Sequence, residues 1–365
     1  MFKYSQIESV HIEITTNCQA KCPMCIRNRK SGLENPNLKL TDMSFENFKK
    51  GLSINFIKQL KSISFCGNYG DPIINNDLMD IIQYLTKTNP NIRCIIHTNG
   101  SARSIEWWKA IANALPQNHI IYFAIDGLED THHLYRVGTH YNKIIENSKA
   151  FIEAGGIAAW VFIKFKHNQH QLKKARELAI EYGFKEFHEK ETARFISKPS
   201  FDVLDKDGNI IYELEMPDNS KLTYVTEDSI RRYTEIFNEP YIVNCKSEEL
   251  KEIFIDAEFN IWPCCFLGSL KMIYTPDTEI YIDIRKRQID EYNNLLYLFG
   301  GIKNINALHS TIEKIIDNDI WQSVWNEEWY SRKNFTCIKT CSKIQKFKIS
   351  TSFDQLLERQ KLNDK

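Results

Sequence analysis

Short β-like runs alternate with longer amphipathic stretches from residue 9 to about residue 195, and this alternation limits the possible folds more than any other feature. The run from Val10 to Ile14 alternates apolar and polar residues, then breaks at Thr16-Asn17. A strand–helix–strand repeat predicts a parallel sheet with right-handed crossovers. Five further runs have the same character: 62–66, 92–97, 119–125, 158–165 and 186–192.

The segments between these runs have the spacing of amphipathic helices, as in 78–86, 104–114, 141–154 and 171–182. Periodicity does not separate a full or partial barrel from an open doubly wound sheet. In each of these folds the reactive groups belong at the carboxyl ends of the strands. Loops with unusual composition follow three of the predicted strands: 67–72, 98–100 and 126–127.

The pattern changes after residue 196. Asp207-Gly208-Asn209 lies between two alternating runs and predicts a hairpin over 201–214. Residues 245–341 contain five cysteines, two short strands around 253–261 and a helical pattern over 312–329, which indicates a smaller second domain. The polar tail after Cys341 predicts a helix over 353–360.

Composition excludes several classes of protein. The chain of 365 residues has 47 Lys and Arg against 47 Asp and Glu, so it lacks the basic surplus of a typical nucleic-acid binder. The N-terminus has no apolar secretory core. The longest weakly polar stretch, 154–163, is about half of a membrane span. We therefore expect a cytoplasmic protein with no membrane or nucleic-acid partner.

Ten cysteines are unevenly placed along the chain. In a reducing compartment such a number favours metal ligation or catalysis over disulfides. Cys18, Cys22 and Cys25 directly follow the first strand, and clustered thiolates select zinc, copper(I) or iron–sulfur centres. A structural zinc site would need a fourth nearby ligand, but residues 26–65 contain no Cys or His. Three ligands leave one position of a cubane cluster open to a cosubstrate.

The motif Cys18-Gln19-Ala20-Lys21-Cys22-Pro23-Met24-Cys25 resembles the signature of the radical S-adenosylmethionine (radical SAM) enzymes. Gly70-Asp71-Pro72 resembles the Gly-Gly-Glu-Pro loop of that family, with Asp71 one methylene shorter than the usual Glu. Asn99, Asp126-Gly127 with Arg136, and Asn168 match the branch of the family that carries auxiliary clusters. The resemblance covers residues 8–195.

This resemblance implies a partial (β/α)6 TIM-like barrel over residues 1–196. Cys18, Cys22 and Cys25 would hold a 4Fe–4S cluster that binds S-adenosylmethionine (SAM). One electron from a flavodoxin- or ferredoxin-type donor would cleave SAM to a 5′-deoxyadenosyl radical, which abstracts a substrate hydrogen atom. The implied SAM contacts are Met24 (through its backbone, in place of the usual aromatic residue), Gly70, Asp71, Asn99, Asp126, Arg136 and Asn168.

The five C-terminal cysteines are Cys245, Cys264, Cys265, Cys337 and Cys341. Their arrangement resembles the auxiliary-cluster module called twitch, related to the longer SPASM module, with Glu258 at a turn position where Gly is usual. The resemblance implies one auxiliary 4Fe–4S cluster, held by Cys245, Cys264, Cys337 and Cys341, with Cys265 as a spare that could replace Cys264. A four-cysteine zinc site is the alternative. Cys66 and Cys94 fit small buried apolar residues.

The implied organisation is a core at 1–196, a connector at 197–244, an α+β auxiliary-cluster domain at 245–345 and a tail at 346–365. The function expected is that of a radical SAM oxidoreductase that oxidises or crosslinks a peptide or amino-acid substrate. The alternatives are a small-molecule substrate (a sugar, nucleoside or antibiotic precursor) and a zinc-stabilised α/β binding module. Polar side chains that could face a barrel lumen are His11, Glu13, Tyr69, Glu189 and Glu191.

Overall fold

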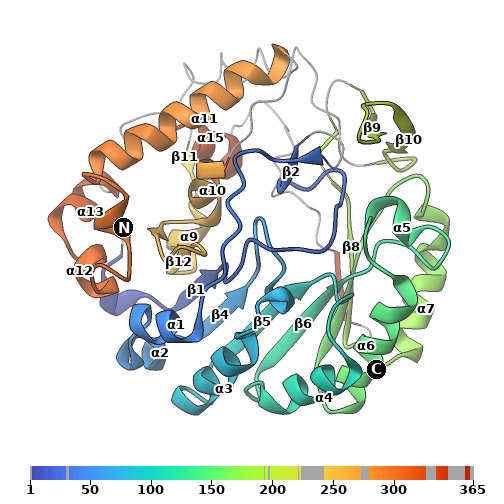
Figure 1. The fold of residues 1–365 in the computed structure, drawn as a ribbon, viewed down its shortest axis with the longest axis horizontal. Helices are drawn as coiled ribbons and strands as arrows, with labels where there is room; N and C mark the ends of the chain where they lie inside the picture. The colour runs from blue at the N-terminus through green and yellow to red at the C-terminus, as the bar shows by residue number, and fades with distance from the viewer. Residues whose placement is uncertain are drawn as a thin grey trace.

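The computed structural model describes residues 2–29, 33–192, 194–195, 198–220, 222, 242–272, 279–325, 334–343 and 358–361. Its largest sheet contains a run of parallel strands that are neighbours in the same order as in the sequence. These strands are β1 (Ser9–Ile12), β4 (Ser62–Phe65), β5 (Arg93–Thr98), β6 (His119–Ala124), β7 (Ala158–Ile163) and β8 (Glu186–Lys190). The sheet curves into the partial (β/α)6 TIM-like barrel expected from the sequence (Figure 1).

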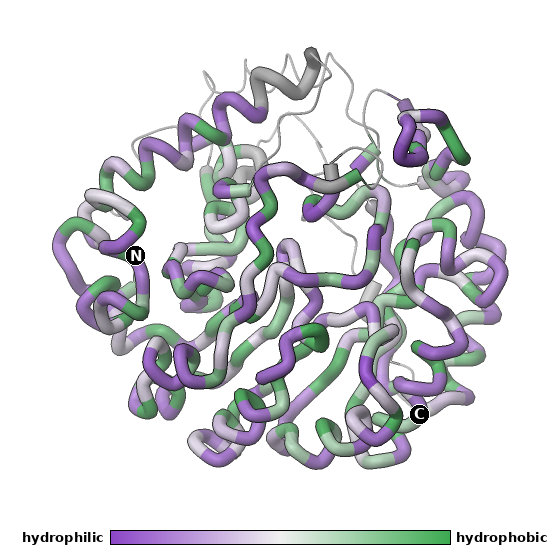
Figure 2. Tube along the Cα trace, viewed as in Figure 1, coloured by the Kyte–Doolittle hydropathy of each residue, from purple (hydrophilic) through white to green (hydrophobic). Residues whose placement is uncertain are grey.

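Amphipathic helices cover the outer face of the curved sheet (Figure 1). In α3 the buried residues Leu78, Ile81, Ile82 and Leu85 recur at helical spacing and form one apolar face. Along these helices hydrophobic and hydrophilic segments alternate, as Figure 2 shows by colour. The helices of the core are α1 (Phe45–Gly51), α2 (Ile54–Gln59), α3 (Leu78–Thr88), α4 (Ile105–Ala114), α5 (His132–Tyr135), α6 (Tyr141–Glu153) and α7 (Leu172–Glu181).

The C-terminal region extends the same sheet. Strand β12 (Glu252–Ile255) pairs in parallel with β1, and β13 (Ile261–Trp262) pairs antiparallel with β12. The sheet gains these strands because Ile253, Phe254 and Ile255 are fully apolar and lie buried against the core. The β-like runs expected around residues 253–261 are therefore confirmed, and they continue the barrel sheet at its β1 edge.

Helices α11 (Glu279–Leu298), α12 (Ile312–Ile316) and α13 (Asp319–Ser323) follow β13 in the chain and lie on the side of the molecule that carries β12 (Figure 1). The sequence prediction did not include α11. The single helix expected over 312–329 is divided, because Asn318 caps α13 by accepting hydrogen bonds from Ile320 N and Trp321 N. Its last four residues lie outside the described residues. The shorter elements of this region are β11 (Ile242–Val243), α9 (Lys246–Glu249), α10 (Cys265–Gly268), η5 (Ser269–Met272), η6 (Ile302–Ile305), α15 (Phe335–Cys341) and β14 (Ser342–Lys343).

Two remaining predictions have different outcomes. The hairpin is confirmed: β9 (Ser200–Leu204) pairs antiparallel with β10 (Ile210–Glu215), and Gly208 in the turn has a φ of +89°. The prediction of a helix over 353–360 is wrong at its end, because strand β15 (Glu358–Lys361) begins there and pairs antiparallel with β8. The edge of β8 offers backbone N–H and C=O groups, and a polar segment can hydrogen-bond to them when it forms a strand. The rest of the predicted helix, residues 353–357, lies outside the described residues.

A short antiparallel pair, β2 (Asn28–Arg29) and β3 (Leu33–Glu34), lies shortly after the first three cysteines. Within the described part of the chain, no helix has both the length and the apolar character needed to cross a membrane.

Candidate active site at the carboxyl edge of the barrel

The first three cysteines lie in the loop after β1, at the carboxyl edge of the parallel strands. Cys22 is buried, whereas Cys18 and Cys25 are half-buried. The backbone N–H of Cys25 donates to the carbonyl of Cys22 at 3.0 Å, which forms a tight turn between the two thiols. A small apolar cluster supports this turn, made of Ala20, Met24, Tyr135, Phe165, Phe195, Val203 and Leu214. The loop is thus a folded, partly enclosed site.

Electrostatics at Cys18 and Cys22 fit a positively charged centre. Burial raises the pKa of Cys18 far above its usual range, and the charges of Asp71, Cys22 and Cys25 raise it further. Burial also raises the pKa of Cys22 to about 11, although Arg136 opposes this effect. A bound iron–sulfur cluster would favour the thiolates that crowding and burial alone disfavour. Three soft donors in one loop therefore fit a cubane with one open iron.

Asp71 joins the loops after β4 and β5. Its Oδ1 accepts from Thr98 Oγ1 at 2.8 Å and from Ile73 N at 3.2 Å, while its Oδ2 accepts from Asn99 N at 2.7 Å and Asn99 Nδ2 at 2.5 Å. Asn99 Oδ1 in turn accepts from Gln19 Nε2 at 2.7 Å, and Asn99 Nδ2 lies 3.8 Å from the Sγ of Cys18. The structure therefore brings two predicted SAM contacts, Asp71 and Asn99, directly to the cysteine loop.

Asp126 and Arg136 form a second bridge to the cysteines. The fully buried Asp126 binds Arg136 Nε through Oδ2 at 2.5 Å, and its Oδ1 accepts from Ile163 N at 2.5 Å. Arg136 Nη1 lies 3.8 Å from the Sγ of Cys22. Asn168 donates to the carbonyls of Asp126 and Ile163, so it braces the ends of β6 and β7 from a fully buried position.

Met24 and Gly70, the other predicted SAM contacts, have local structural roles. The side chain of Met24 is buried, and its carbonyl accepts from Arg194 Nη1 at 2.8 Å. A Cβ at Gly70 would lie 1.9 Å from the carbonyl oxygen of Thr15, so only glycine fits where this loop crosses the end of β1. Gly70 is therefore required by the contact between two loops of the chain itself.

Glu13 and Tyr69 have roles that the sequence did not reveal. Glu13 Oε1 accepts from the backbone N–H of Tyr69 at 2.6 Å and of Gly70 at 3.0 Å. Burial raises the pKa of Glu13 to about 8, with a contribution from Asp256. The sequence placed Glu13 and Tyr69 among candidates for a lumen, but both are buried at 3% and 4% exposure and fix the 67–71 loop. The sequence signal that could have indicated a buried role is the position of this carboxylate between two apolar residues, Ile12 and Ile14.

The other residues predicted to face the lumen, Glu189, Glu191 and His11, have different hydrogen-bonding partners. Glu189 and Glu191 both pair with Lys164 Nζ at 3.0 Å, which gives them a structural ion pair. His11 Nε2 lies 2.6 Å from the carbonyl oxygen of Cys66. As expected, Cys94 is a buried core residue, while Cys66 is half-buried.

Three of the C-terminal cysteines lie close together. Burial is the main cause that raises the pKa of Cys264 to about 12, and the charges of Cys245 and Cys341 add to it. Burial also raises the pKa of Cys245, with a contribution from the charge of Cys341. The backbone N–H of Asn244 donates to the carbonyl of Cys341 at 2.9 Å, which joins the segments of Cys245 and Cys341. Cys337 precedes Cys341 by one turn of α15.

Cys265 differs from the adjacent Cys264 in the more distant charges that affect its thiol. Its pKa is raised first by burial, then by Cys264, Cys66 and Glu252. Of these, Cys66 and Glu252 lie on the barrel sheet, whereas the pKa of Cys264 responds to Cys245 and Cys341. The two adjacent cysteines therefore have different further neighbours. In the described part of the chain, no group of three or more His, Cys, Asp or Glu side chains is placed to hold a single metal ion.

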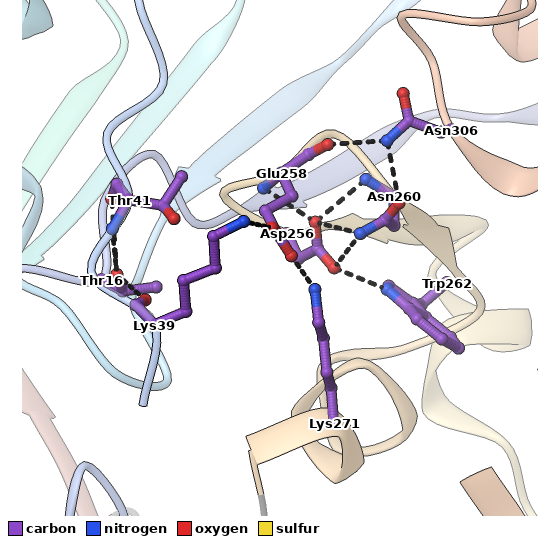
Figure 3. A network of polar contacts seen from close by, with 9 residues as sticks. All are labelled: Thr16, Lys39, Thr41, Asp256, Glu258, Asn260, Trp262, Lys271 and Asn306. Carbon is purple, nitrogen blue, oxygen red and sulfur yellow. Dashed lines mark hydrogen bonds and ion pairs between the residues drawn. The ribbon is translucent and has the colours of Figure 1, made fainter. Parts of the chain in front are cut away.

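A polar network fixes the turn between β12 and β13, shortly before Cys264 in the chain; Figure 3 shows this network. Asp256 accepts hydrogen bonds from Asn260 and from Trp262 Nε1 at 3.0 Å, and Glu258 pairs with Lys39 Nζ at 2.6 Å and with Lys271 (Figure 3). Glu258 is compatible with this turn because the positive φ, +67°, falls on Phe259. Glu258 thus connects the segment after the first cysteine loop to η5.

The N-terminal half of the chain matches a known family. Residues 12–179 match the model described as the Radical SAM superfamily. A curated protein of Methanocaldococcus jannaschii, 7,8-dihydro-6-hydroxymethylpterin dimethyltransferase, is 29% identical over 148 residues. That match covers 38% of this chain and only 27% of the M. jannaschii protein.

Solved structures with a similar fold cover most of the chain. SuiB of Streptococcus suis bound to S-adenosylmethionine is 12% identical with a TM-score of 0.51, covering 90% of this chain and 71% of that one. Native anSMEcpe with bound AdoMet and Cp18Cys peptide is 13% identical with a TM-score of 0.50, covering 91% of this chain and 88% of that one. At such low identity these similarities show the fold alone.

Proposed function

Because residues 12–179 match the Radical SAM superfamily, we propose that the chain is a radical SAM oxidoreductase that acts on a peptide or amino-acid substrate. The observation that carries the proposal is that two hydrogen-bonded pairs, Asp71–Asn99 and Asp126–Arg136, lie beside the three-cysteine loop at one edge of the barrel. Asp71–Asn99 reaches Cys18, and Asp126–Arg136 reaches Cys22. This arrangement joins a soft donor set to charged groups suited to a zwitterionic cosubstrate.

In this proposal Cys18, Cys22 and Cys25 hold a 4Fe–4S cluster. When bound, the cluster supplies one electron, taken from an external flavodoxin- or ferredoxin-type donor, that cleaves SAM to methionine and a radical able to take a hydrogen atom from the substrate. The protein excludes water with the apolar cluster around Met24 and Tyr135. It also holds the reacting groups in a fixed orientation.

The structure refines the role proposed for Asp71. Its two carboxylate oxygens already accept four hydrogen bonds, about as many as they can accept. Asp71 therefore supplies negative charge beside Cys18 and orients Asn99, whose side-chain amide nitrogen lies 3.8 Å from the thiol sulfur. Arg136 is the corresponding group for a carboxylate or ribose hydroxyl near Cys22.

We further propose that Cys245, Cys264, Cys337 and Cys341 hold one auxiliary 4Fe–4S cluster. The proximity of Cys264 to Cys245 and Cys341 supports this set. An oxidised auxiliary cluster would accept one electron from the substrate radical, while the substrate loses a proton, which completes a two-electron oxidation. Replacement of Cys337 by Ala should spare SAM cleavage in the absence of substrate but abolish substrate turnover.

The peptide substrate is favoured by structural neighbours that were solved with peptides, SuiB with its precursor peptide SuiA and anSMEcpe with Cp18Cys. The alternative is a small-molecule substrate, such as a sugar, nucleoside or antibiotic precursor, and the similarity to a pterin dimethyltransferase is the observation that favours it. A zinc-stabilised binding module without redox activity is the alternative of another class.

Anaerobic reconstitution tests these alternatives. The proposal predicts about eight iron and about eight sulfide per chain, from two cubane clusters. It also predicts formation of 5′-deoxyadenosine from SAM when dithionite is added. Stoichiometric zinc without sulfide would contradict the enzyme function and support the binding module.

A further inference from the structure

A cleft with a volume of about 410 Å³ lies between the end of α11, η6, α12 and α13. This volume is in the range of pockets that bind small molecules. All the residues that line the cleft lie between Phe299 and Trp321, so none belongs to the cysteine loop or to the loops after the parallel strands. The cleft is therefore separate from the site described above, and the proposed function does not use it.

Local hydrogen bonds fix the walls of the cleft. Asn304 Nδ2 donates to the carbonyl of Phe299 at 2.9 Å and to that of Gly300 at 3.2 Å, which holds η6 against the end of α11. Thr311 caps α12 by accepting from a backbone N–H at 3.2 Å, and Asn318 caps α13. The cleft is thus formed by the protein itself, so binding of a ligand would need little further ordering of the chain.

The base of the cleft is apolar and aromatic. Phe299 and Trp321 are 2% and 1% exposed, and their rings stack at 5.3 Å with an interplanar angle of 25°. Ile305 and Ile315, which also line the cleft, are buried to a similar extent. Among the described residues, the buried Trp321 Nε1 has no hydrogen-bond partner. The base therefore suits a flat apolar group, and it contains an indole N–H that is not used by the described protein.

Basic side chains form the exposed rim of the cleft. Lys303, His309 and Lys314 all line it and are exposed. Within the described part of the chain, neither lysine makes an ion pair or a side-chain hydrogen bond. Each ammonium group is a compact charge on a flexible stem, so it can turn toward a ligand in the cleft. The rim therefore offers two positive charges that no described residue neutralises.

The carboxylates of the same stretch are Glu313, Asp317 and Asp319, and none of them lines the cleft. Asp317 Oδ1 accepts from the backbone N–H of Tyr4 at 2.8 Å, so this carboxylate faces η1 (Tyr4–Gln6). Helix α12 packs against η1, and burial followed by the charges of Glu313 and Asp317 raises the pKa of Tyr4. Asp319 is exposed in the first turn of α13. The charged side chains that line the cleft are therefore all basic.

We propose that this cleft binds a small amphipathic anion, which has a flat apolar ring and carries a carboxylate or a phosphate. The ring lies against Phe299 and Trp321, and the anionic group contacts the ammonium groups of Lys303 and Lys314. A ligand of this kind uses both the base and the rim of the cleft, whereas a neutral ring or a small anion uses only one of them. The proposal does not rest on the proposed function, because no cysteine and no proposed SAM contact lines the cleft.

Calorimetric titration of the reconstituted full chain, with SAM bound, tests the cleft. The probes are 2-naphthoate, 2-naphthyl phosphate, the neutral 2-naphthamide, and acetate, which lacks an apolar ring. We expect at least one naphthyl anion to bind with one site per chain, and the amide and acetate to bind at least about fivefold more weakly. Binding of 2-naphthoate alone identifies a carboxylate site, and binding of 2-naphthyl phosphate alone identifies a phosphate site.

Variants of the lining residues test whether the anion binds in this cleft. Lys303→Met and Lys314→Met should each weaken binding of the naphthyl anion by about threefold, because contacts between exposed charges contribute modestly. Lys303→Arg and Lys314→Arg keep the charge and should bind more tightly than the Met variants. Ile320→Glu places a carboxylate at a lining position that is 48% exposed, so it should also weaken binding. A carboxylate in the first turn of α13 is favourable for the helix, so this variant should fold.

Lys87→Met, on the exposed side of α3, is the matched control and should bind like the wild type. Denaturant unfolding of each variant distinguishes loss of the contact from loss of the fold. Equal binding of 2-naphthamide or acetate, or no binding of any probe, would overturn the proposal. Wild-type affinity in the Lys303→Met/Lys314→Met double variant or in Ile320→Glu would overturn it as well, because the anion would then bind elsewhere.

Discussion

The phenol of Tyr69 donates a hydrogen bond to the carbonyl oxygen of Ser269 at 2.5 Å. Asn68 Nδ2, one residue earlier, donates to the carbonyl of Cys265 at 3.1 Å. The loop that leads to Asp71 is thus bonded directly to the segment that follows Cys264. These two contacts therefore link the position of the 265–269 segment to that of the loop beside Cys18.

Replacement of Tyr69 by Phe should destabilise the protein and weaken this connection. The Ser269 carbonyl would lose a donor in a buried position, which costs on the order of 1–3 kcal/mol. We expect a lower free energy of unfolding in denaturant titrations, together with weaker SAM binding. Tyr297→Phe serves as the control because Tyr297 is 83% exposed, and it should behave like the wild type. Wild-type stability and SAM affinity in Tyr69→Phe would refute this role.

Replacement of Cys22 by Ala should abolish reductive cleavage of SAM. The remaining thiols, Cys18 and Cys25, provide two ligands where the open-site cubane needs three. We expect no 5′-deoxyadenosine with dithionite and a loss of about four iron per chain. Continued formation of 5′-deoxyadenosine by this variant would show that the cluster lies elsewhere.

Cys264 and Cys265 provide a matched pair of variants. Cys264→Ser should lower the iron content by about four per chain, because its thiol lies near Cys245 and Cys341. Cys265→Ser should keep the full iron content, because its neighbours Cys66 and Glu252 belong to the barrel. The reverse result would assign Cys265 as the ligand.

Glu13 should make stability depend on pH. Burial raises its pKa in the folded state from 4.5 to about 8, so the folded state binds more protons than the unfolded state between these values. The contribution of Glu13 to stability is therefore fully present below about pH 4.5 and is lost as the pH rises through about 8. Glu13→Gln should show a smaller loss of stability over this range, measured by anaerobic denaturant unfolding. An unchanged pH dependence would contradict the raised pKa.

The sequence by itself determined which segments form the parallel strands and at which edge the functional loops meet. Hydrophobic alternation identifies strands and helices, and parallel strands place their carboxyl ends at one edge. For this reason Cys18, Asp71 and Asn99, which are far apart in the chain, were expected near one another. Local spacing also predicted the hairpin around Gly208, because its turn depends on adjacent residues alone.

Only the tertiary structure decided which side each of two neighbouring residues faces and which distant segment it contacts. The separation of Cys264 from Cys265 depends on the positions of Cys245, Cys341 and Cys66, which local sequence does not specify. Likewise β15 is a strand because β8 offers an open edge, although its sequence pattern is helical. Contacts between remote segments outweigh local propensity wherever burial or backbone pairing contributes more free energy than the intrinsic preference of the chain.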